Sequence, residues 1–449
     1  MTFHRSANRR IMETSNTPKQ RNTNNQPAMS HWKEYKLGEI GKIITGTTPP
    51  TKNPENYGNF LLFVTPTDFD AYNKTVNNSI RSISEIAVNK FKNRIIPKDS
   101  VIVTCIGSQM GKVAINKKAC LTNQQINSII PNKEFDSDFI YYTLKSMQDY
   151  LRNLATGGST MPIINKSSFE NITITVPPLP TQTAIASILS SLDQKIELNN
   201  AINRNLEALA QALFKQWFVE FEFPVDQNGN FSPLTGEMSQ GQRGYKSSGG
   251  EMVESELGMI PKGWRVGSIY EASDVIYGAP FKSSLFNQEK KGYPLIRIRD
   301  LKTYAPQFWT EENHPKGVII RAGELVVGMD AEFRPHIWLG EEAYLNQRLC
   351  HFKPKGYFTR LFVCETIRPQ LMFHENSSVG TTVIHLGKKE IDSFKTLIPP
   401  NNIIQSFGET TEPILEQIVN NSKENRNLKS LRDTLLPKLI SGELEVKDV

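Results

Sequence analysis

The feature that most constrains the fold of this chain is an internal repeat. The first set of matches, at a constant offset of 232 residues, pairs Trp32 with Trp264, Leu37 with Ile269, Gly46 with Gly278 and Asp68 with Asp300. The later set, at an offset of 222, pairs Gly158 with Gly380, Thr160 with Thr382, Lys166 with Lys388 and Pro177 with Pro399. Chance matches would not keep a constant offset over so many residues. The chain therefore consists of two copies of one unit, which implies two similar sites.

Each copy combines a β-rich segment with a long helix. Short apolar runs at 40–44, 60–64 and 101–106 are separated by Gly, Pro and Asn, a pattern typical of strands and turns. From Thr181 to Phe221 the chain has neither Gly nor Pro, and apolar residues recur every three or four positions, which predicts an amphipathic helix. Such a helix spans roughly 55 to 60 Å. The sequence therefore predicts an α+β protein with two tandem β-rich domains, each followed by a long helix.

The changes in composition also predict the domain boundaries. We expect a disordered tail at 1–30, a first β-rich domain at 31–180, its helix at 181–221, a mobile linker rich in Gly, Ser and Gln at 222–263, a second β-rich domain at 264–400, and a second helix with a C-terminal tail at 401–449.

The two predicted helices carry the heptad pattern of a coiled coil. With Ile185 at position a, the d positions are Ile188, Ile202 and Leu209. The further a positions are Leu192, Asn199, Leu206 and Leu213 in the first helix and Phe407, Ile414, Asn421, Leu428 and Leu435 in the second. One Asn in an apolar seam fixes the register of a coiled coil at some cost in stability. We expect the helices to pair with each other, Asn199 lying near Asn421 if the pairing is antiparallel; the alternative is that each helix packs on its own domain with its Asn in solvent.

The motifs that accompany most enzyme chemistry are missing from the sequence. The segment Gly107–Val113 is one residue too short for a phosphate-binding loop and has Val where Ser or Thr would hold magnesium. The seven histidines and four cysteines have no metal-ligand spacing, and we expect the cysteines to be buried apolar residues in a reducing compartment. The chain has no apolar run of about 18 residues and no signal peptide, so we expect a soluble, cytoplasmic protein without catalytic residues.

Residue types suited to DNA occur at loop-like positions of both copies. Asn and Gln suit adenine, Arg suits guanine, and Ser, Thr and backbone amides suit phosphates. The candidates for DNA contacts are Thr47, Thr48, Lys52, Thr67, Gln109, Lys112, Ser159 and Thr160 in the first copy, and Lys282, Arg297, Arg299, Arg334, Thr381 and Thr382 in the second. The alternative for each is an ordinary solvated side chain. For Asn123–Gln124 and Asn346–Gln347, which recur in both copies, we expect a structural role.

The net charge of +6 is unevenly distributed along the chain. The predicted β-rich domains carry 17 Lys+Arg against 12 Asp+Glu in the first and 18 against 15 in the second, whereas both helices and the linker are net negative. This distribution favours a polyanionic partner for the two domains.

Several features in combination resemble a known family. These are the tandem units, the Trp32-to-Gly46 and Trp264-to-Gly278 entries, the segment Leu257–Trp264 before the second entry, the Pro-Pro exits followed by Gln182 and Gln405, and the two long helices. In these respects the sequence resembles the specificity subunit of a Type I restriction-modification system. The resemblance covers nearly everything from residue 31 to the C-terminus.

The resemblance implies a division of labour between subunits. Two target-recognition domains would each read one half of an asymmetric, bipartite DNA sequence, and an antiparallel coiled coil would set the spacer between the halves. Two methyltransferase subunits would carry S-adenosylmethionine and the methylation chemistry, and two restriction and translocase subunits would consume ATP; magnesium would also be bound by the partner subunits. This chain itself would then hold no cofactor and no metal.

Three alternatives stay open from the sequence. A methyltransferase-only system would use the same subunit, a two-module coiled-coil scaffold would show no DNA affinity, and a self-sufficient modification enzyme would bind S-adenosylmethionine alone. Neither of the last two explains why the repeats keep their helices aligned while the segments between them diverge.

Overall fold

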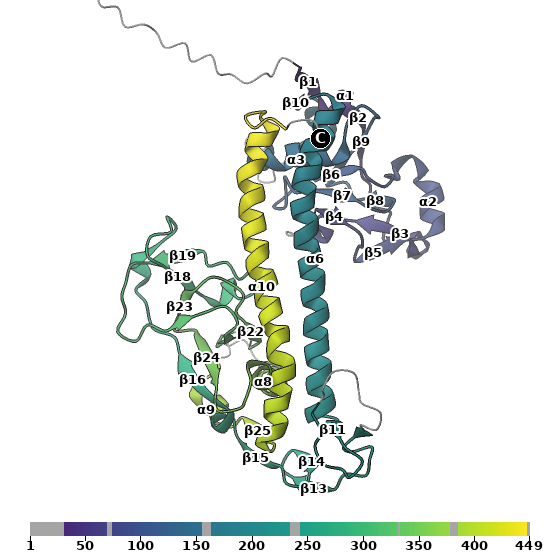
Figure 1. Cartoon of the computed structure of the whole chain (residues 1–449). Coiled ribbons are helices and arrows are strands. Elements are labelled where there is room, and N and C mark those ends of the chain that lie inside the picture. Colours follow the sequence, from purple (N-terminus) through teal and green to yellow (C-terminus); the bar gives the residue numbers. More distant parts are fainter. Residues whose placement is uncertain are drawn as a thin grey trace, which may run out of the picture. The chain divides into compact units, whose positions relative to one another are not determined.

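The computed structural model in Figure 1 describes residues 31–69, 74–154, 163–233, 243–330, 333–377 and 385–446. Contacts divide the chain into two units, 1–190 with 434–449 and 191–433. Each of the two long helices, α6 (Leu179–Phe218) and α10 (Asn401–Ile440), contributes residues to both units. No helix in the described ranges is long and apolar enough to cross a membrane.

The first unit is built on three sheets. Its strands are β1 (Lys33–Lys36), β2 (Gly41–Thr45), β3 (Tyr57–Val64), β4 (Thr75–Val76), β5 (Arg81–Ile83), β6 (Val101–Thr104), β7 (Val113–Asn116), β8 (Cys120–Thr122), β9 (Ile126–Pro131) and β10 (Thr173–Val176). Its shorter helices are α1 (Leu37–Ile40), α2 (Glu85–Lys90), α3 (Ser137–Ser146), α4 (Gln148–Asn153), α5 (Lys166–Glu170), and the 3-10 turns η1 (Pro54–Asn56), η2 (Pro66–Asp68) and η3 (Lys92–Arg94). The sheet orders are β2-β9-β6-β7-β4, β5-β3-β8 and β1-β10.

The second unit contains the β-rich part of the second copy and most of the two long helices. Its strands are β11 (Pro224–Val225), β12 (Arg243–Gly244), β13 (Met252–Ser255), β14 (Gly258–Pro261), β15 (Arg265–Ser268), β16 (Ser273–Tyr277), β17 (Phe286–Asn287), β18 (Tyr293–Ile296), β19 (Phe308–Thr310), β20 (Ile319–Ile320), β21 (Leu325–Gly328), β22 (Pro335–Ile337), β23 (Ala343–Leu345), β24 (Leu349–Pro354) and β25 (Lys395–Ile398). Its shorter helices are α7 (Ile269–Ala272), α8 (Arg360–Ser377), α9 (Lys388–Asp392), η4 (Ser283–Leu285) and η5 (Ile298–Asp300).

The sheet topology repeats along with the sequence. The order β2-β9-β6-β7 of the first unit returns as β16-β24-β21-β22, and the two-stranded β1-β10 returns as β15-β25. The parallel pair β3 and β8 returns as β18 and β23, with Phe63 opposite Leu121 in the first and Leu295 opposite Tyr344 in the second. One strand breaks this correspondence: β4 pairs with β7, but no described strand pairs with the matching edge of β22. The predicted α+β class with two tandem β-rich domains is confirmed.

A helix fills the core beside the sheet in each unit. In the first unit α3 buries Phe139 and Leu144 completely, and in the second α8 buries Phe362 and Ile367. These residues correspond at an offset of 223, so the repeat preserves the apolar face of this helix. Burial of large apolar side chains of this kind supplies most of the driving force for folding.

The long helices pair antiparallel, as predicted. Within the second unit, Asp193 Oδ1 lies 2.6 Å from Arg432 Nη1, Asn199 Nδ2 donates to Asn425 Oδ1 (3.0 Å), and Asn421 Nδ2 donates to Asn203 Oδ1 (2.8 Å). Within the first unit, Ile185 and Leu189 of α6 share a core with Leu436 and Leu439 of α10. The partner number falls as the α6 number rises, which defines the antiparallel direction.

Both predicted seam asparagines are buried, but they do not bond to each other. Asn199 pairs with Asn425 and Asn421 pairs with Asn203. Because Asn203 and Asn425 also correspond at an offset of 222, the two hydrogen bonds are copies of one contact. Their four side chains, Asn199, Asn203, Asn421 and Asn425, form one buried group that we call the asparagine cluster.

The heptad phase predicted for the first helix is wrong at two d positions. Ile188 and Leu209 are 37% and 49% exposed. The buried line on α6 runs instead through Leu189, Ile196, Asn203, Ala210 and Trp217. The predicted seam residues Leu192, Leu206, Leu213, Ile414, Leu428 and Leu435 are half-buried. The heptad pattern alone predicts that polar residues face solvent. Asp193 and Asn203 point inward instead, because Arg432 and Asn421 pair with them.

The prediction of a mobile linker at 222–263 is wrong for the described residues 222–233 and 243–263. Phe223 is buried, and its ring stacks on Tyr245 (centroids 4.7 Å apart) and Trp264 (5.2 Å). The antiparallel strand pairs β11–β12 and β13–β14 also lie in this stretch. Packing of a few aromatic residues stabilises the segment. The average composition, rich in Gly and Ser, does not reveal this packing.

Candidate nucleic-acid interface

The first unit gathers several loops beyond the ends of β2, β3, β6 and β8, which we call the first loop face. Its described segments are 46–53, 65–69, 105–112 and 123–125. Three backbone hydrogen bonds join them: Thr47 N–H to Thr122 O (2.8 Å), Asn123 N–H to Val64 O (3.0 Å) and Cys105 N–H to Gln125 O (2.7 Å). Rigid strands therefore present these loops together, which is the usual way a scaffold displays binding residues.

The predicted residues of the first loop face differ in how firmly they are held. Thr48 Oγ1 donates to Gln124 Oε1, and Thr67 Oγ1 lies 2.8 Å from Thr65 Oγ1. The half-buried Lys112 donates its backbone N–H to Thr104 Oγ1 (2.9 Å), and its Nζ lies 3.5 Å from Phe69 O. Thr47 is half-buried, whereas Lys52 and Gln109 are exposed. The exposed side chains are the ones most available to a partner.

The second unit repeats this arrangement in the second loop face, made of residues 278–285, 297–301, 328–330, 333–334 and 346–348. The matching backbone bonds are Ala279 N–H to Leu345 O (3.0 Å), Asn346 N–H to Ile296 O (3.2 Å) and Met329 N–H to Arg348 O (2.9 Å). The same scaffold therefore presents a second set of loops with different side chains.

The predicted cations of the second loop face fall into two kinds. The Arg297 guanidinium lies 4.1 Å from the centroid of the Phe308 ring, and its Nε lies 3.7 Å from the buried Asp300 carboxylate. Arg299 and Lys282 are exposed, and the backbone N–H of Lys282 donates to Glu312 Oε2 (2.8 Å). Arg334 is 61% exposed and reaches Glu375 only at 4.0 Å. Arg297 is thus fixed within the fold, whereas Arg299, Lys282 and Arg334 extend from it.

Two repeated residues in these loops have a structural explanation. A Cβ on Gly46 would lie 2.1 Å from Asn123 O, and one on Gly278 would lie 2.2 Å from Asn346 O, so both positions admit only Gly. Asp68 Oδ2 accepts the Thr65 N–H (2.7 Å), and Asp300 Oδ2 accepts the Arg297 N–H (2.9 Å). Each Asp therefore closes the same turn at the end of its strand.

The structure adds a polar group that the sequence did not indicate. Asp330 accepts from His385 Nδ1 (2.7 Å), and its other oxygen lies 3.0 Å from Arg348 Nη1. The side chains of His385 and Arg348 are about half exposed, at 51% and 55%. Arg348 directly follows the repeated Asn346–Gln347 pair, and this position in the sequence could have marked it as a candidate.

The first unit also has a contact that no motif predicted. Arg94 Nη1 donates to Thr45 O (2.8 Å) at the end of β2.

Four predicted residues, Ser159, Thr160, Thr381 and Thr382, lie outside the described residues.

The repeated Asn123 and Asn346 hold turns through their backbone groups, and Asn123 Nδ2 also donates to Gln125 Oε1 (2.8 Å). Gln124, by contrast, is exposed beside Thr48.

The chemistry available at the two loop faces is hydrogen bonding and charge attraction. No group of three His, Cys, Asp or Glu residues in the described ranges is placed to hold a metal ion. Burial raises the pKa of the Cys105, Cys120 and Cys364 thiols to about 12, and it also raises the pKa of Cys350. These thiols are therefore protonated at neutral pH and poor nucleophiles.

Comparisons with known proteins match both copies. The family model described as the Type I restriction modification DNA specificity domain matches residues 29–208 and 261–430. The two matches start 232 residues apart and end 222 apart, the same offsets that relate the repeats.

Several relatives are similar over nearly their whole length. The chain is 30% identical to the Type I restriction enzyme MjaIX specificity subunit of Methanocaldococcus jannaschii, over 93% of this chain and 94% of that protein. It is 25% identical to the HindI specificity subunit of Haemophilus influenzae, over 93% of this chain and all of that protein. In fold, it matches the crystal structure of the Type I restriction-modification S subunit from M. genitalium with a TM-score of 0.53 at 17% identity, covering 91% of this chain and 96% of that one. The chain therefore belongs to the family of Type I restriction-modification specificity subunits.

Proposed function

We propose that this chain recognises an asymmetric, bipartite DNA sequence, with each loop face reading one half. The observation that carries the proposal is the repeat: two units have the same strand topology and the same turn-closing Gly and Asp residues, but different side chains at the ends of the strands. A shared scaffold with different loops suits the reading of two different half-sites.

Charge and hydrogen-bonding groups support DNA as the partner. The loop faces present exposed Lys52 and Gln109 in the first unit, and Lys282, Arg299 and Arg334 in the second. Arg can contact guanine O6 and N7 through two hydrogen bonds, Gln can do the same with adenine, and Lys suits phosphate. We assign base reading to Arg299 and Gln109 in preference to Arg297, because Arg297 is held against Phe308 and Asp300.

The partners follow from the family. We propose that the chain positions two methyltransferase subunits, and two restriction subunits where these are present, on the DNA. The paired helices would set the number of base pairs between the half-sites. In support, each helix has 40 residues and the asparagine cluster pins the register of their pairing.

Binding of the assembled complex to DNA tests this function. The chain with its methyltransferase subunits should bind its target about a thousandfold or more tighter than random DNA. Binding to random DNA should weaken steeply with salt, because phosphate contacts release counterions. Equal affinity for target and random DNA would contradict sequence recognition, and affinity independent of salt would contradict the phosphate contacts.

A further inference from the structure

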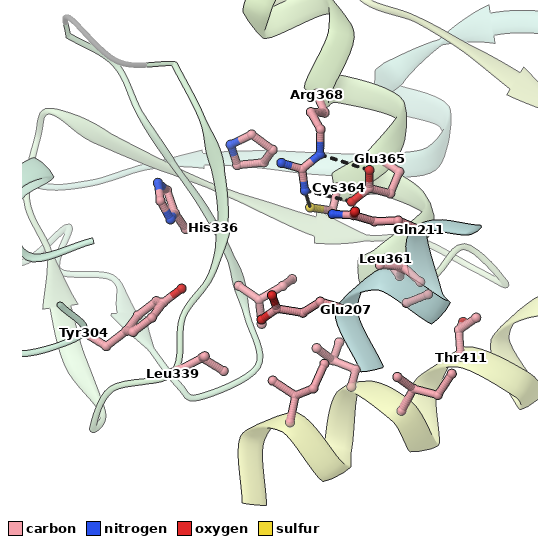
Figure 2. Close-up of a pocket in the computed structure, with 16 residues that line it drawn as sticks. Glu207, Gln211, Tyr304, His336, Leu339, Leu361, Cys364, Glu365, Arg368 and Thr411 are labelled. Atoms are coloured by element: carbon pink, nitrogen blue, oxygen red, sulfur yellow. Dashed lines mark hydrogen bonds and ion pairs between the residues drawn. The ribbon is translucent and has the colours of Figure 1, made fainter. Parts of the chain in front are cut away.

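The second unit contains a cavity of about 200 Å³ between its helices and the edge of its sheet. Figure 2 shows the residues that line it, among them Glu207 of α6, Arg368 of α8, Thr411 of α10, His336 of β22 and Tyr304 from the turn after η5. Sites for drug-sized molecules are larger, about 300 to 1,000 Å³. The cavity therefore suits one side chain or a similarly small group.

The corresponding place in the first unit is filled by a lysine. Lys74, just before β4, is only 7% exposed, and its Nζ lies 2.7 Å from both Asp138 Oδ1 and Ser190 Oγ. The same ammonium lies 4.9 Å from the Tyr142 ring centroid and 5.6 Å from that of Tyr141. The residues that match Asp138, Tyr141 and Tyr142 at an offset of 223 are Leu361, Cys364 and Glu365, and all three line the cavity.

The strand that carries this lysine has no described counterpart in the second unit. In the first unit Ile115 N–H donates to Lys74 O (3.0 Å) and Lys117 N–H donates to Val76 O (3.2 Å), which adds β4 to the edge of β7. The matching donors in the second unit are Ile337 and Leu339, which both line the cavity. The Trp338 N–H between them donates to Glu324 O (2.8 Å), and because N–H groups alternate along a strand, those of Ile337 and Leu339 face the other edge. The edge of β22 beside the cavity is thus open to an added strand.

The cavity wall also lacks an ion pair that the first copy's position would carry. On the cavity wall, Ala210 of α6 and Leu415 of α10 stand at the positions that the repeat relates to Arg432 and Asp193. Arg432 and Asp193 form an ion pair (2.6 Å), whereas Ala210 is much smaller than Arg432 and leaves room for an incoming group, and Leu415 carries no charge.

The charges of the cavity favour a cation. Glu365 is neutralised by Arg368, whose Nη2 and Nε lie 2.7 Å and 2.9 Å from its two oxygens. Glu207 has no such partner among the described residues. Burial raises the pKa of Glu207, although the charges of Arg368 and Arg204 lower it. Burial and the negative charge of Glu207 raise the pKa of Tyr304 to about 12, so the phenol stays protonated. Glu207, an exposed residue on the cavity wall, therefore has no ion pair among the described residues, although the charges of Arg368 and Arg204 act on it.

We propose that this cavity binds a lysine or arginine side chain carried by an extended segment of a partner protein, which adds as a parallel strand to the edge of β22. Glu207 takes the charge of the incoming side chain, and the N–H groups of Ile337 and Leu339 bind the carbonyls of the incoming backbone. The first unit supplies the template for this contact within its own chain, in Lys74, Thr75 and Val76. The proposal is independent of DNA recognition.

A peptide with the sequence of residues 72–79 of this chain serves as the probe, and ligand-observed NMR with the full-length protein measures its binding. We expect the peptide to bind, and Glu207→Gln to weaken it by about tenfold, the loss typical of a charge-assisted hydrogen bond. Glu416→Gln, at an exposed position of α10 that does not line the cavity, should leave binding unchanged and serves as the matched control.

Changes in the peptide separate the two parts of the contact. A peptide with Gln in place of Lys74 should lose the same tenfold factor, and one with Pro in place of Val76 should not bind because Pro cannot join the strand ladder. Absence of binding by the parent peptide, or equal binding to the Glu207→Gln protein, would overturn the proposal. Equally tight binding of free n-butylamine would overturn the added strand.

Discussion

Arg297 and Arg299 are two residues apart, yet their surroundings differ. Arg297 is packed on the Phe308 ring beside a buried carboxylate, whereas Arg299 is exposed. An arginine that is already engaged by an aromatic ring and a carboxylate would have to leave both to reach a base, at a cost in free energy. The Arg299 guanidinium has no ion pair or hydrogen bond with the described residues that it would have to give up, so specificity in the second half-site should depend more on Arg299.

Replacement of Arg299 tests this difference. We expect Arg299→Ala to weaken binding of the target DNA by about 1 to 3 kcal/mol and to relax specificity at one base pair of one half-site. Competition binding with single-base variants of the target measures both effects.

The matched control is Arg321→Ala, which removes the same charge from the same unit at a position where Arg321 Nε bonds Glu342 (2.9 Å) away from the loop segments. If Arg321→Ala relaxes the same base preference as Arg299→Ala, the loss reflects charge alone and the assignment of base reading to Arg299 is wrong.

The four cysteines offer a second test at the scale of single residues. All four are buried, and because burial raises each pKa far above neutrality, they are thiols and not thiolates at pH 8. Ellman's reagent should therefore react slowly with the native protein at pH 8 and with four thiols per chain in urea. A thiol that reacts within seconds in the native protein would show that its predicted burial is wrong.

At the scale of elements, the asparagine cluster explains how two helices of this length hold one register. A slip by one heptad would remove the Asn199–Asn425 and Asn421–Asn203 bonds together and leave four amides without these partners. Buried amides without partners are costly, so the cluster disfavours alternative registers more than an apolar seam would.

The effects of single substitutions in the asparagine cluster on the free energy of unfolding should not add up when the substitutions are combined. Asn421→Leu removes the donor to Asn203 Oδ1 and should lower the free energy of unfolding by about 1 to 3 kcal/mol, whereas Asn203→Leu with Asn421→Leu should cost less than the sum of the two single changes. Urea unfolding followed by circular dichroism measures both. Asn205→Leu, at an exposed position of the same helix, is the control. Additive losses would mean that the two side chains do not interact.

Helix length is the other property of these elements, and the proposed spacing role depends on it. One heptad adds about 10.5 Å to a helix, which corresponds to about three base pairs of DNA. Insertion of seven residues into both helices, after Asn203 in α6 and before Ile418 in α10, keeps the facing positions matched. We expect the methylated site to gain up to about three base pairs in its spacer, with both half-sites unchanged. An unchanged spacer would contradict the role of the helices in spacing.

At the scale of the whole molecule, the repeat predicted the two copies, and the patterns within each copy predicted the α+β class and the helix pairing. These follow from apolar periodicity, which the sequence displays directly. Inward polar residues could not be predicted in the same way. Asp193 and Asn203 read as surface residues because their partners, Arg432 and Asn421, are more than 200 positions away. The folded segment around Phe223 and Tyr245 was missed for a related reason, since a few aromatic contacts outweigh a flexible average composition.

The interface could be predicted only in outline. Residue types and loop positions indicated Lys52, Gln109 and Arg299, but the sequence could not separate Arg299 from Arg297, because the difference lies in contacts with Phe308. Nor did any motif point to the Asp330, Arg348 and His385 group, which forms only when three separate segments meet.

The most direct test of the central claim is to sequence the methylated bases in the genome of a host that carries this chain with its methyltransferase partner. The account predicts one asymmetric motif of two defined halves with a spacer of fixed length, and predicts that Arg299→Ala alters one half and leaves the other intact. A single continuous motif, or a variant that changes both halves together, would contradict recognition by two separate loop faces.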